Sequence, residues 1–135
     1  MSSMLKEIVL LAAMLVAITN ASVQSISVKG RLACDDKSLR NVHVELKERD
    51  TFDPDDSLGV VHSDKEGHFE VSGQEDEFSI EPYLVITHNC DGGVINPSCT
   101  ITDEYPISKE HINGVYDMGI VSLNIVPEKR HRRCK

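Results

Sequence analysis

Residues 58–73 read Leu58-Gly-Val-Val-His-Ser-Asp-Lys-Glu-Gly-His-Phe-Glu-Val-Ser-Gly73, and this stretch decides the fold class. A short apolar segment leads into a polar turn, in which Gly67 stands where a tight hairpin commonly needs a positive φ. In the returning segment Phe69 and Val71 alternate with polar residues, which places both of them on one face. The stretch therefore predicts a β-hairpin with one buried face.

The same alternation continues on both sides of this hairpin. Before it, Val42, Val44 and Leu46 alternate with polar residues. After it, residues 83–90 are the most apolar segment and are expected to form a central strand. We expect strands at 26–34, 42–47, 58–62, 68–73, 83–90, 99–106 and 115–126, with a bulge near Val121 and one helical turn within 108–114. About seven strands without a long amphipathic helix predict an all-β sandwich.

The beginning of the chain is typical of a cleaved signal peptide. Lys6 precedes an apolar run of about eleven residues, which is too short to cross a bilayer of about 30 Å as a helix. Small residues at Thr19 and Ala21 predict cleavage before Ser22. A membrane anchor or a buried helix is the alternative. We therefore expect a signal peptide at residues 1–21, a single domain at 22–135, and a secreted, extracellular protein.

Four cysteines, Cys34, Cys90, Cys99 and Cys134, lie in the expected mature chain. An even number in a small exported protein predicts two disulfides. If the strands at 83–90 and 99–106 form a hairpin, Cys90 and Cys99 lie opposite each other, and a bond between them is easy. Zinc is the alternative, but the spacing lacks a Cys-x-x-Cys pair. We expect no metal and no cofactor.

Charge is distributed unevenly along the chain. Residues 22–128 hold 8 Lys and Arg against 21 Asp and Glu, whereas residues 129–135 hold five Lys and Arg and no acid. Such a basic tail can attract an anionic lipid surface. The alternative is a solubilising tail that balances the acidic body. The candidate binding residues are Lys47, Arg49, Lys129, Arg130, Arg132 and Arg133.

Catalytic motifs are missing from the sequence. The six histidines include no pair at the i, i+4 spacing of a helical zinc site, and His43 and His62 are expected on the surface of strands. The chain has no Gly-x-Ser-x-Gly elbow and no phosphate loop. An acidic loop with Asp50, Asp53, Asp55 and Asp56 could bind calcium, but it lacks EF-hand spacing. We expect no catalytic residues and no enzymatic activity.

Four motifs in this order and spacing resemble the nematode transthyretin-like family. They are Val28-Lys-Gly-Arg-Leu-Ala-Cys34, Asp53-Pro-Asp-Asp-Ser-Leu58, Ser63-Asp-Lys-Glu-Gly-His-Phe-Glu-Val-Ser-Gly73 and Glu81-Pro-Tyr-Leu-Val-Ile-Thr-His-Asn-Cys-Asp-Gly-Gly93. The resemblance implies an extracellular transthyretin-like β-sandwich of seven antiparallel and parallel strands. Its first strand would run parallel to its last, with their C-terminal ends together. This implies disulfides Cys34–Cys134 and Cys90–Cys99.

The resemblance also bears on function. A hydrolase of purine breakdown shares this fold, but its N-terminal His-x-x-Asp and C-terminal Tyr-Arg-Gly-Ser motifs are missing here. We therefore expect a secreted binding or bridging protein that recognises a cell-surface receptor or an anionic membrane lipid, for example phosphatidylserine. We expect no nucleic acid partner and at most a weak homo-oligomer. The alternative is a carrier of a small apolar ligand in the manner of transthyretin.

Overall fold

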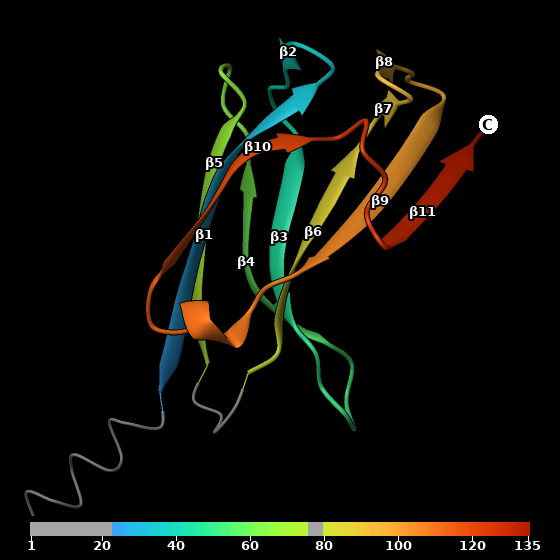
Figure 1. The fold of residues 1–135 in the computed structure, drawn as a ribbon. Helices are drawn as coiled ribbons and strands as arrows, with labels where there is room; N and C mark the ends of the chain where they lie inside the picture. The colour runs from blue at the N-terminus through green and yellow to red at the C-terminus, as the bar shows by residue number, and fades with distance from the viewer. Residues whose placement is uncertain (1–22, 76–79) are drawn as a thin grey trace, which may run out of the picture.

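The computed structural model describes residues 23–75 and 80–135, which form two packed β-sheets (Figure 1). The predicted signal peptide at residues 1–21 lies outside the described residues. Residues 76–79 also lie outside the described residues. No helix in the described ranges has the length and apolar character needed to cross a membrane.

The first sheet, sheet A, is built around the longest strand. This strand, β1 (Gln24–Cys34), lies between β10 (Val115–Ser122), which is parallel to it, and β5 (His68–Glu75), which is antiparallel. The short β2 (Lys37–Ser38) pairs with the end of β1. Mixed parallel and antiparallel pairing agrees with the expected class.

The second sheet, sheet B, is antiparallel throughout, with the order β11-β9-β6-β3-β4. Its strands are β3 (His43–Glu48), β4 (Asp56–His62), β6 (Pro82–His88), β9 (Cys99–Pro106) and β11 (Lys129–Cys134). A small hairpin of β7 (Cys90–Asp91) and β8 (Val94–Ile95) and a 3₁₀ turn η1 (Lys109–His111) complete the described elements. The predicted all-β transthyretin-like sandwich with two disulfides is confirmed.

The core lies between the two sheets and follows the predicted alternation. The predicted β-hairpin of residues 58–73 is wrong, because β4 pairs with β3 in sheet B whereas β5 pairs with β1 in sheet A, so the turn at Asp64 to Gly67 joins the two sheets. The predicted inward positions of β5, Phe69 and Val71, are nevertheless buried, and so are those of β3, Val44 and Leu46. They pack in one cluster with apolar side chains of β1, β6 and β10. The predicted bulge lies slightly earlier than expected, because the β1–β10 register shifts around Gly119, whose φ is 66°.

The predicted disulfide pairing is wrong. The bonds join Cys34 to Cys90 and Cys99 to Cys134, instead of Cys34 to Cys134 and Cys90 to Cys99. Cys90 leaves its place opposite Cys99 because the β6–β9 ladder ends before Asn89, and the chain continues into the β7–β8 hairpin. Cys90 is buried in the core and meets the end of β1, so its bond to Cys34 ties sheet A to the β7–β8 hairpin that directly follows β6.

The second bond depends on a strand that was not predicted. After β10 the chain crosses to sheet B, where β11 pairs antiparallel with β9 (Figure 1). Their register places Cys134 directly opposite Cys99. The tail was expected to be pinned beside β1, but its sequence has no apolar alternation that would have revealed a strand. The basic tail is therefore the edge strand of sheet B.

Candidate functional site

The side chains of β11 alternate between the inner and outer faces of sheet B. Arg130 lies opposite Asp103, and Asp103 lies opposite the core residue Ile86, so Arg130 faces the interior. Alternation along a strand then directs Arg130, Arg132 and Cys134 inward and Lys129, His131 and Arg133 outward. The predicted cationic cluster is thus divided between two faces.

Arg130 is held by a buried carboxylate. Its Nε and Nη2 donate to the two carboxylate oxygens of Asp103 at 2.6 and 2.7 Å, and Nη2 also donates to the carbonyl of Leu123 at 2.9 Å. The Asp103 side chain is fully buried, and only 11% of the Arg130 side chain is exposed. Such bidentate pairs are geometrically specific. Arg130 therefore anchors β11 to the domain.

His88 completes this buried network. Its Nε2 lies 2.8 Å from Asp103, and its Nδ1 accepts a hydrogen bond from the Cys90 backbone amide at 3.0 Å. Since Nδ1 is an acceptor, the ring proton lies on Nε2 and is donated to Asp103. Burial raises the pKa of Asp103, but the hydrogen bonds from Arg130 and His88 outweigh it and keep that pKa below its usual range. Both ring nitrogens are engaged, so His88 positions the chain and is not a free general base.

A second ion pair ties β11 to the β7–β8 hairpin. Arg132 Nε and Nη2 donate to the two oxygens of Asp91 at 2.9 and 2.7 Å. The hydrogen bond from Arg132 lowers the pKa of the Asp91 carboxyl below its usual value. At the next inward position of β11, Cys134 is bonded to Cys99. Three successive inward side chains of β11 therefore have structural partners.

The two predicted cations on β3 and just after it behave differently from each other. The Arg49 guanidinium carbon lies 4.3 Å above the centre of the Tyr83 ring, and its Nη2 donates to Glu104 at 3.1 Å. Glu104 also lies 3.9 Å from the amino group of Lys129. Lys47 stands opposite Tyr83 in the ladder and is half-buried. Arg49 therefore belongs to an ionic network on the outer face of sheet B.

Carboxylates of the acidic loop bind the loop itself. Asp50 accepts hydrogen bonds from the backbone amides of Phe52 and Asp53, and Asp55 accepts one from the backbone of Asp50. Asp55 also accepts the hydroxyl proton of Tyr83, which lowers the pKa of Asp55. The carboxylates of Asp50 and Asp55 therefore have structural partners.

The exposed cations at the outward positions of β11 and at the residue after it are called the β11 strip: Lys129, which also pairs with Glu104, Arg133 and Lys135, with His131 between them. The Lys129 side chain is 64% exposed. The strip is fixed in place by the inward anchors of the same strand and by the bond from Lys135 N to the Ser98 carbonyl at 2.9 Å. A rigid strand that presents cations on one face can dock on an anionic surface without further ordering.

Aliphatic side chains are exposed on the β7–β8 hairpin, which Arg132 contacts through Asp91, and on the β10–β11 loop, which leads into β11. Asn124 Cβ lies 3.8 Å from the Cβ position of Gly93, so the β10–β11 loop contacts the β7–β8 hairpin. The two residues after Gly93 and the two after Asn124 are exposed. They are Val94 (66%), Ile95 (45%), Ile125 (68%) and Val126 (64%). We call these four residues the apolar rim.

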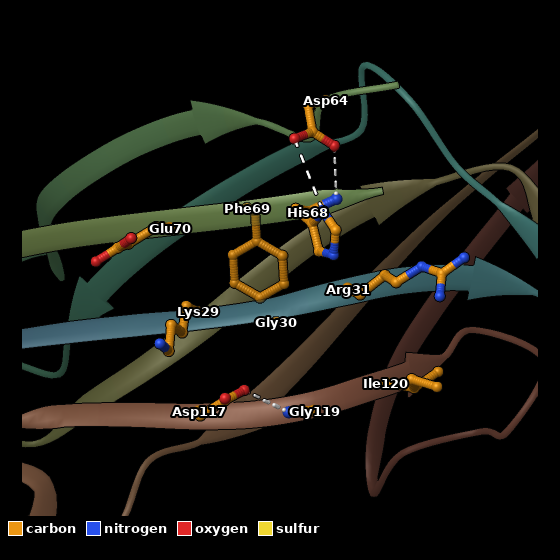
Figure 2. A pocket seen from close by; sticks show the side chains of 10 residues that line it. All are labelled: Lys29, Gly30, Arg31, Asp64, His68, Phe69, Glu70, Asp117, Gly119 and Ile120. Carbon is orange, nitrogen blue, oxygen red and sulfur yellow. Dashed lines mark hydrogen bonds and ion pairs between the residues drawn. The ribbon is translucent and has the colours of Figure 1, made fainter. Parts of the chain in front are cut away.

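A hollow of about 580 Å³ lies on the outer face of sheet A (Figure 2). Lys29 stands between Glu70 of β5 and Asp117 of β10 in the ladder. At one end, Arg31 donates to Ser38 Oγ and to the Glu66 carbonyl. Charges of both signs therefore alternate across the three strands, and the hollow does not favour ligands of one charge.

The sequence analysis missed the partners of the inward cations. Asp103 follows Cys99 and Ile101 at alternate positions of an expected strand. A carboxylate in such an inward position requires a buried partner, because an isolated buried charge is very unfavourable. That signal could have predicted a buried cation, but not that Arg130 would supply it.

Comparison with known proteins gives one consistent family. The profile of the transthyretin-like family matches residues 29–108. Transthyretin-like protein 16 of Caenorhabditis elegans is 42% identical over 116 residues, which cover 85% of this chain and 86% of that protein. Transthyretin-like protein 46 of the same species is 35% identical over 134 residues, with coverage of 94% and 75%. Part of a 9R-lipoxygenase from Cyanothece superposes with a TM-score of 0.49 and 20% identity, covering 78% of this chain and 17% of that one.

Proposed function

Because this chain belongs to the transthyretin-like family, we propose that it is an extracellular binding protein that docks on phosphatidylserine-containing membranes through the β11 strip. The observation that carries the proposal is the exposure of Lys129, Arg133 and Lys135 on a rigid edge strand. Two disulfides support an extracellular location, since such bonds persist in oxidising compartments. The proposal includes no catalytic step.

The charge distribution determines how the protein would approach such a membrane. Residues 22–128 carry 21 acids against 8 Lys and Arg, so most of the surface is repelled by anionic lipid. The β11 strip reverses that sign locally. A Lys or Arg side chain near an anionic membrane contributes about 1 kcal/mol to binding. The three Lys and Arg side chains of the strip should therefore strengthen binding by about a hundredfold at low salt. The apolar rim would add contact with the acyl boundary.

Vesicle binding tests this proposal. The mature, disulfide-bonded protein is incubated with phosphatidylcholine vesicles that contain graded fractions of phosphatidylserine, at low and high salt. We expect binding to rise with phosphatidylserine and to weaken with salt. Replacing Lys129, Arg133 and Lys135 by Gln should abolish most binding.

A matched variant controls for total charge. Lys29, Arg40 and Lys65 are exposed cations outside β11, and their replacement by Gln changes the net charge equally. This control should bind as the unaltered protein does. No binding at low salt, or equal loss in both variants, would refute the lipid proposal. Binding to cells that is independent of phosphatidylserine would point instead to a receptor protein.

The alternative function, transport of a small apolar ligand, stays a prediction. The hollow on the outer face of sheet A is open to solvent, and charged side chains of both signs line it. The space between the sheets is occupied by the buried core cluster. No observation on the described residues favours the carrier over the binding protein.

A further inference from the structure

Two histidines face each other on the outer face of sheet B, at the end of the β3–β4 ladder. His43 and His62 are directly opposite in the register, and their ring centroids lie 5.3 Å apart. We propose that this pair binds one divalent transition-metal ion, with one imidazole nitrogen supplied by each ring.

The ladder shows why the two rings come close. The Ser63 amide donates to the Val42 carbonyl at 3.0 Å, whereas the Val42 amide donates to the Ser63 hydroxyl at 2.9 Å, so the ladder has a backbone bond on this side of the His43–His62 pair. The next pair along an antiparallel ladder is the non-hydrogen-bonded type, in which the strands and their side chains approach most closely. His43 and His62 occupy that pair. The backbone therefore brings the two imidazoles together before any ion binds.

The imidazole rings of this pair have no polar partner among the described residues. Within residues 23–75 and 80–135, neither the His43 nor the His62 side chain forms a hydrogen bond or an ion pair, and each ring contacts the other edge to face. His88, by contrast, uses both of its nitrogens. His43 is half-buried and His62 is exposed, so an ion can reach them from solvent.

The donor set decides the class of ion. Two neutral imidazoles suit zinc, copper and nickel, whereas calcium and magnesium require oxygen ligands. Water can occupy the other coordination positions. Glu45 lies two residues along β3 on the same face, and the acidic body adds further attraction for a cation. Copper(II) should bind more tightly than nickel or zinc, following the general order of affinity.

The site is separate from the proposed membrane surface. Sheet B runs β11-β9-β6-β3-β4, so the histidine pair lies at the opposite edge from the β11 strip. Metal binding can therefore be present whether or not the protein binds vesicles, and the two proposals fail independently.

Calorimetric titration with CuCl₂, NiCl₂ and ZnCl₂ tests the proposal on the mature, disulfide-bonded protein, without thiols or chelators, near pH 7.5. We expect one ion per chain, with copper the tightest. His43→Gln and His62→Gln should each weaken copper binding by about tenfold or more, because one ligand leaves the chelate. Electron paramagnetic resonance of the copper-loaded protein should show hyperfine coupling to two imidazole nitrogens.

Two other histidines serve as controls. His68 lies near Asp64 and Glu66 in an exposed cluster, and His131 stands on β11. His68→Gln and His131→Gln should leave copper affinity unchanged, and circular dichroism should confirm that all four variants fold. Binding weaker than about 1 mM in the unaltered protein would overturn the proposal. So would equal affinity in the double variant of His43 and His62, or loss of binding in His68→Gln instead.

Discussion

Replacing Arg130 by Met tests the buried network that holds the edge strand. Met fills a similar length without the charge, and it leaves Asp103 buried with His88 at 2.8 Å and the Tyr105 hydroxyl at 3.5 Å as its remaining side-chain partners. Removal of one partner from a buried ion pair commonly costs 3–5 kcal/mol. Because His88 still donates to Asp103, we expect a loss of about 3 kcal/mol in the free energy of unfolding at pH 7.

The pH dependence of that loss follows from the pKa of Asp103. This pKa is depressed in the native protein, so Asp103 contributes stability above its unfolded pKa of about 3.9, and the contribution is lost as pH falls through the folded pKa. Without Arg130 the strongest influence that lowers this pKa is gone, so we expect the pKa of Asp103 in the variant to lie above its value in the native protein. Asp103 of the variant then becomes protonated at a higher pH, and the variant's deficit in stability against the native protein should shrink on acidification.

Urea unfolding followed by far-ultraviolet circular dichroism measures this, since the chain has no Trp to report by fluorescence. Unfolding curves at pH 7 and near pH 3.5 should show a large and a small difference, respectively. Arg133→Met is the matched control, because Arg133 lies on the same strand and faces solvent. Equal losses in both variants, or a deficit for Arg130→Met that does not change with pH, would refute the reasoning.

Two further predictions concern covalent and steric constraints. Under mild reduction the Cys99–Cys134 bond should open before the Cys34–Cys90 bond, because Cys134 is exposed whereas both Cys34 and Cys90 are buried. Alkylation of the freed thiols followed by peptide mass spectrometry gives the order of opening. Gly73→Ala should lower stability by about 1–3 kcal/mol in urea unfolding, since its Cβ would lie 2.5 Å from Leu58 Cβ and 2.6 Å from the Leu58 carbonyl oxygen.

The sequence predicted the sandwich because burial imposes a period of two on most of its strands. Val44 and Leu46, or Phe69 and Val71, reveal an inward face in any window that contains them. β11 was missed because Lys129 to Cys134 contains no aliphatic or aromatic side chain. Its inward positions are filled by guanidinium groups, whose partners lie on β7 and β9. Such ion pairs are tertiary contacts, which a local sequence pattern cannot reveal.

The sequence did not predict the correct disulfide pairing or the contact between His43 and His62, and the reasons are related. Cys90 and Cys99 lie opposite each other only if the β6–β9 ladder continues past His88, and nothing in the sequence marks the departure at Asn89. Helical spacing does not reveal two ligands that meet across a ladder, as His43 and His62 do. The strand 58–62 was expected to pair with 68–73, so no predicted register placed His62 opposite His43.

Alternation in β11 also changes how its charge should be counted. Five Lys and Arg follow residue 128, but Arg130 and Arg132 neutralise Asp103 and Asp91. Their removal should weaken folding, and it should affect membrane binding only through the loss of the strand. Removal of Lys129 or Arg133 should weaken binding while the fold persists. The even-numbered cations of β11 therefore stabilise the fold, whereas the odd-numbered ones are available for membrane binding. Net charge alone does not distinguish these two roles.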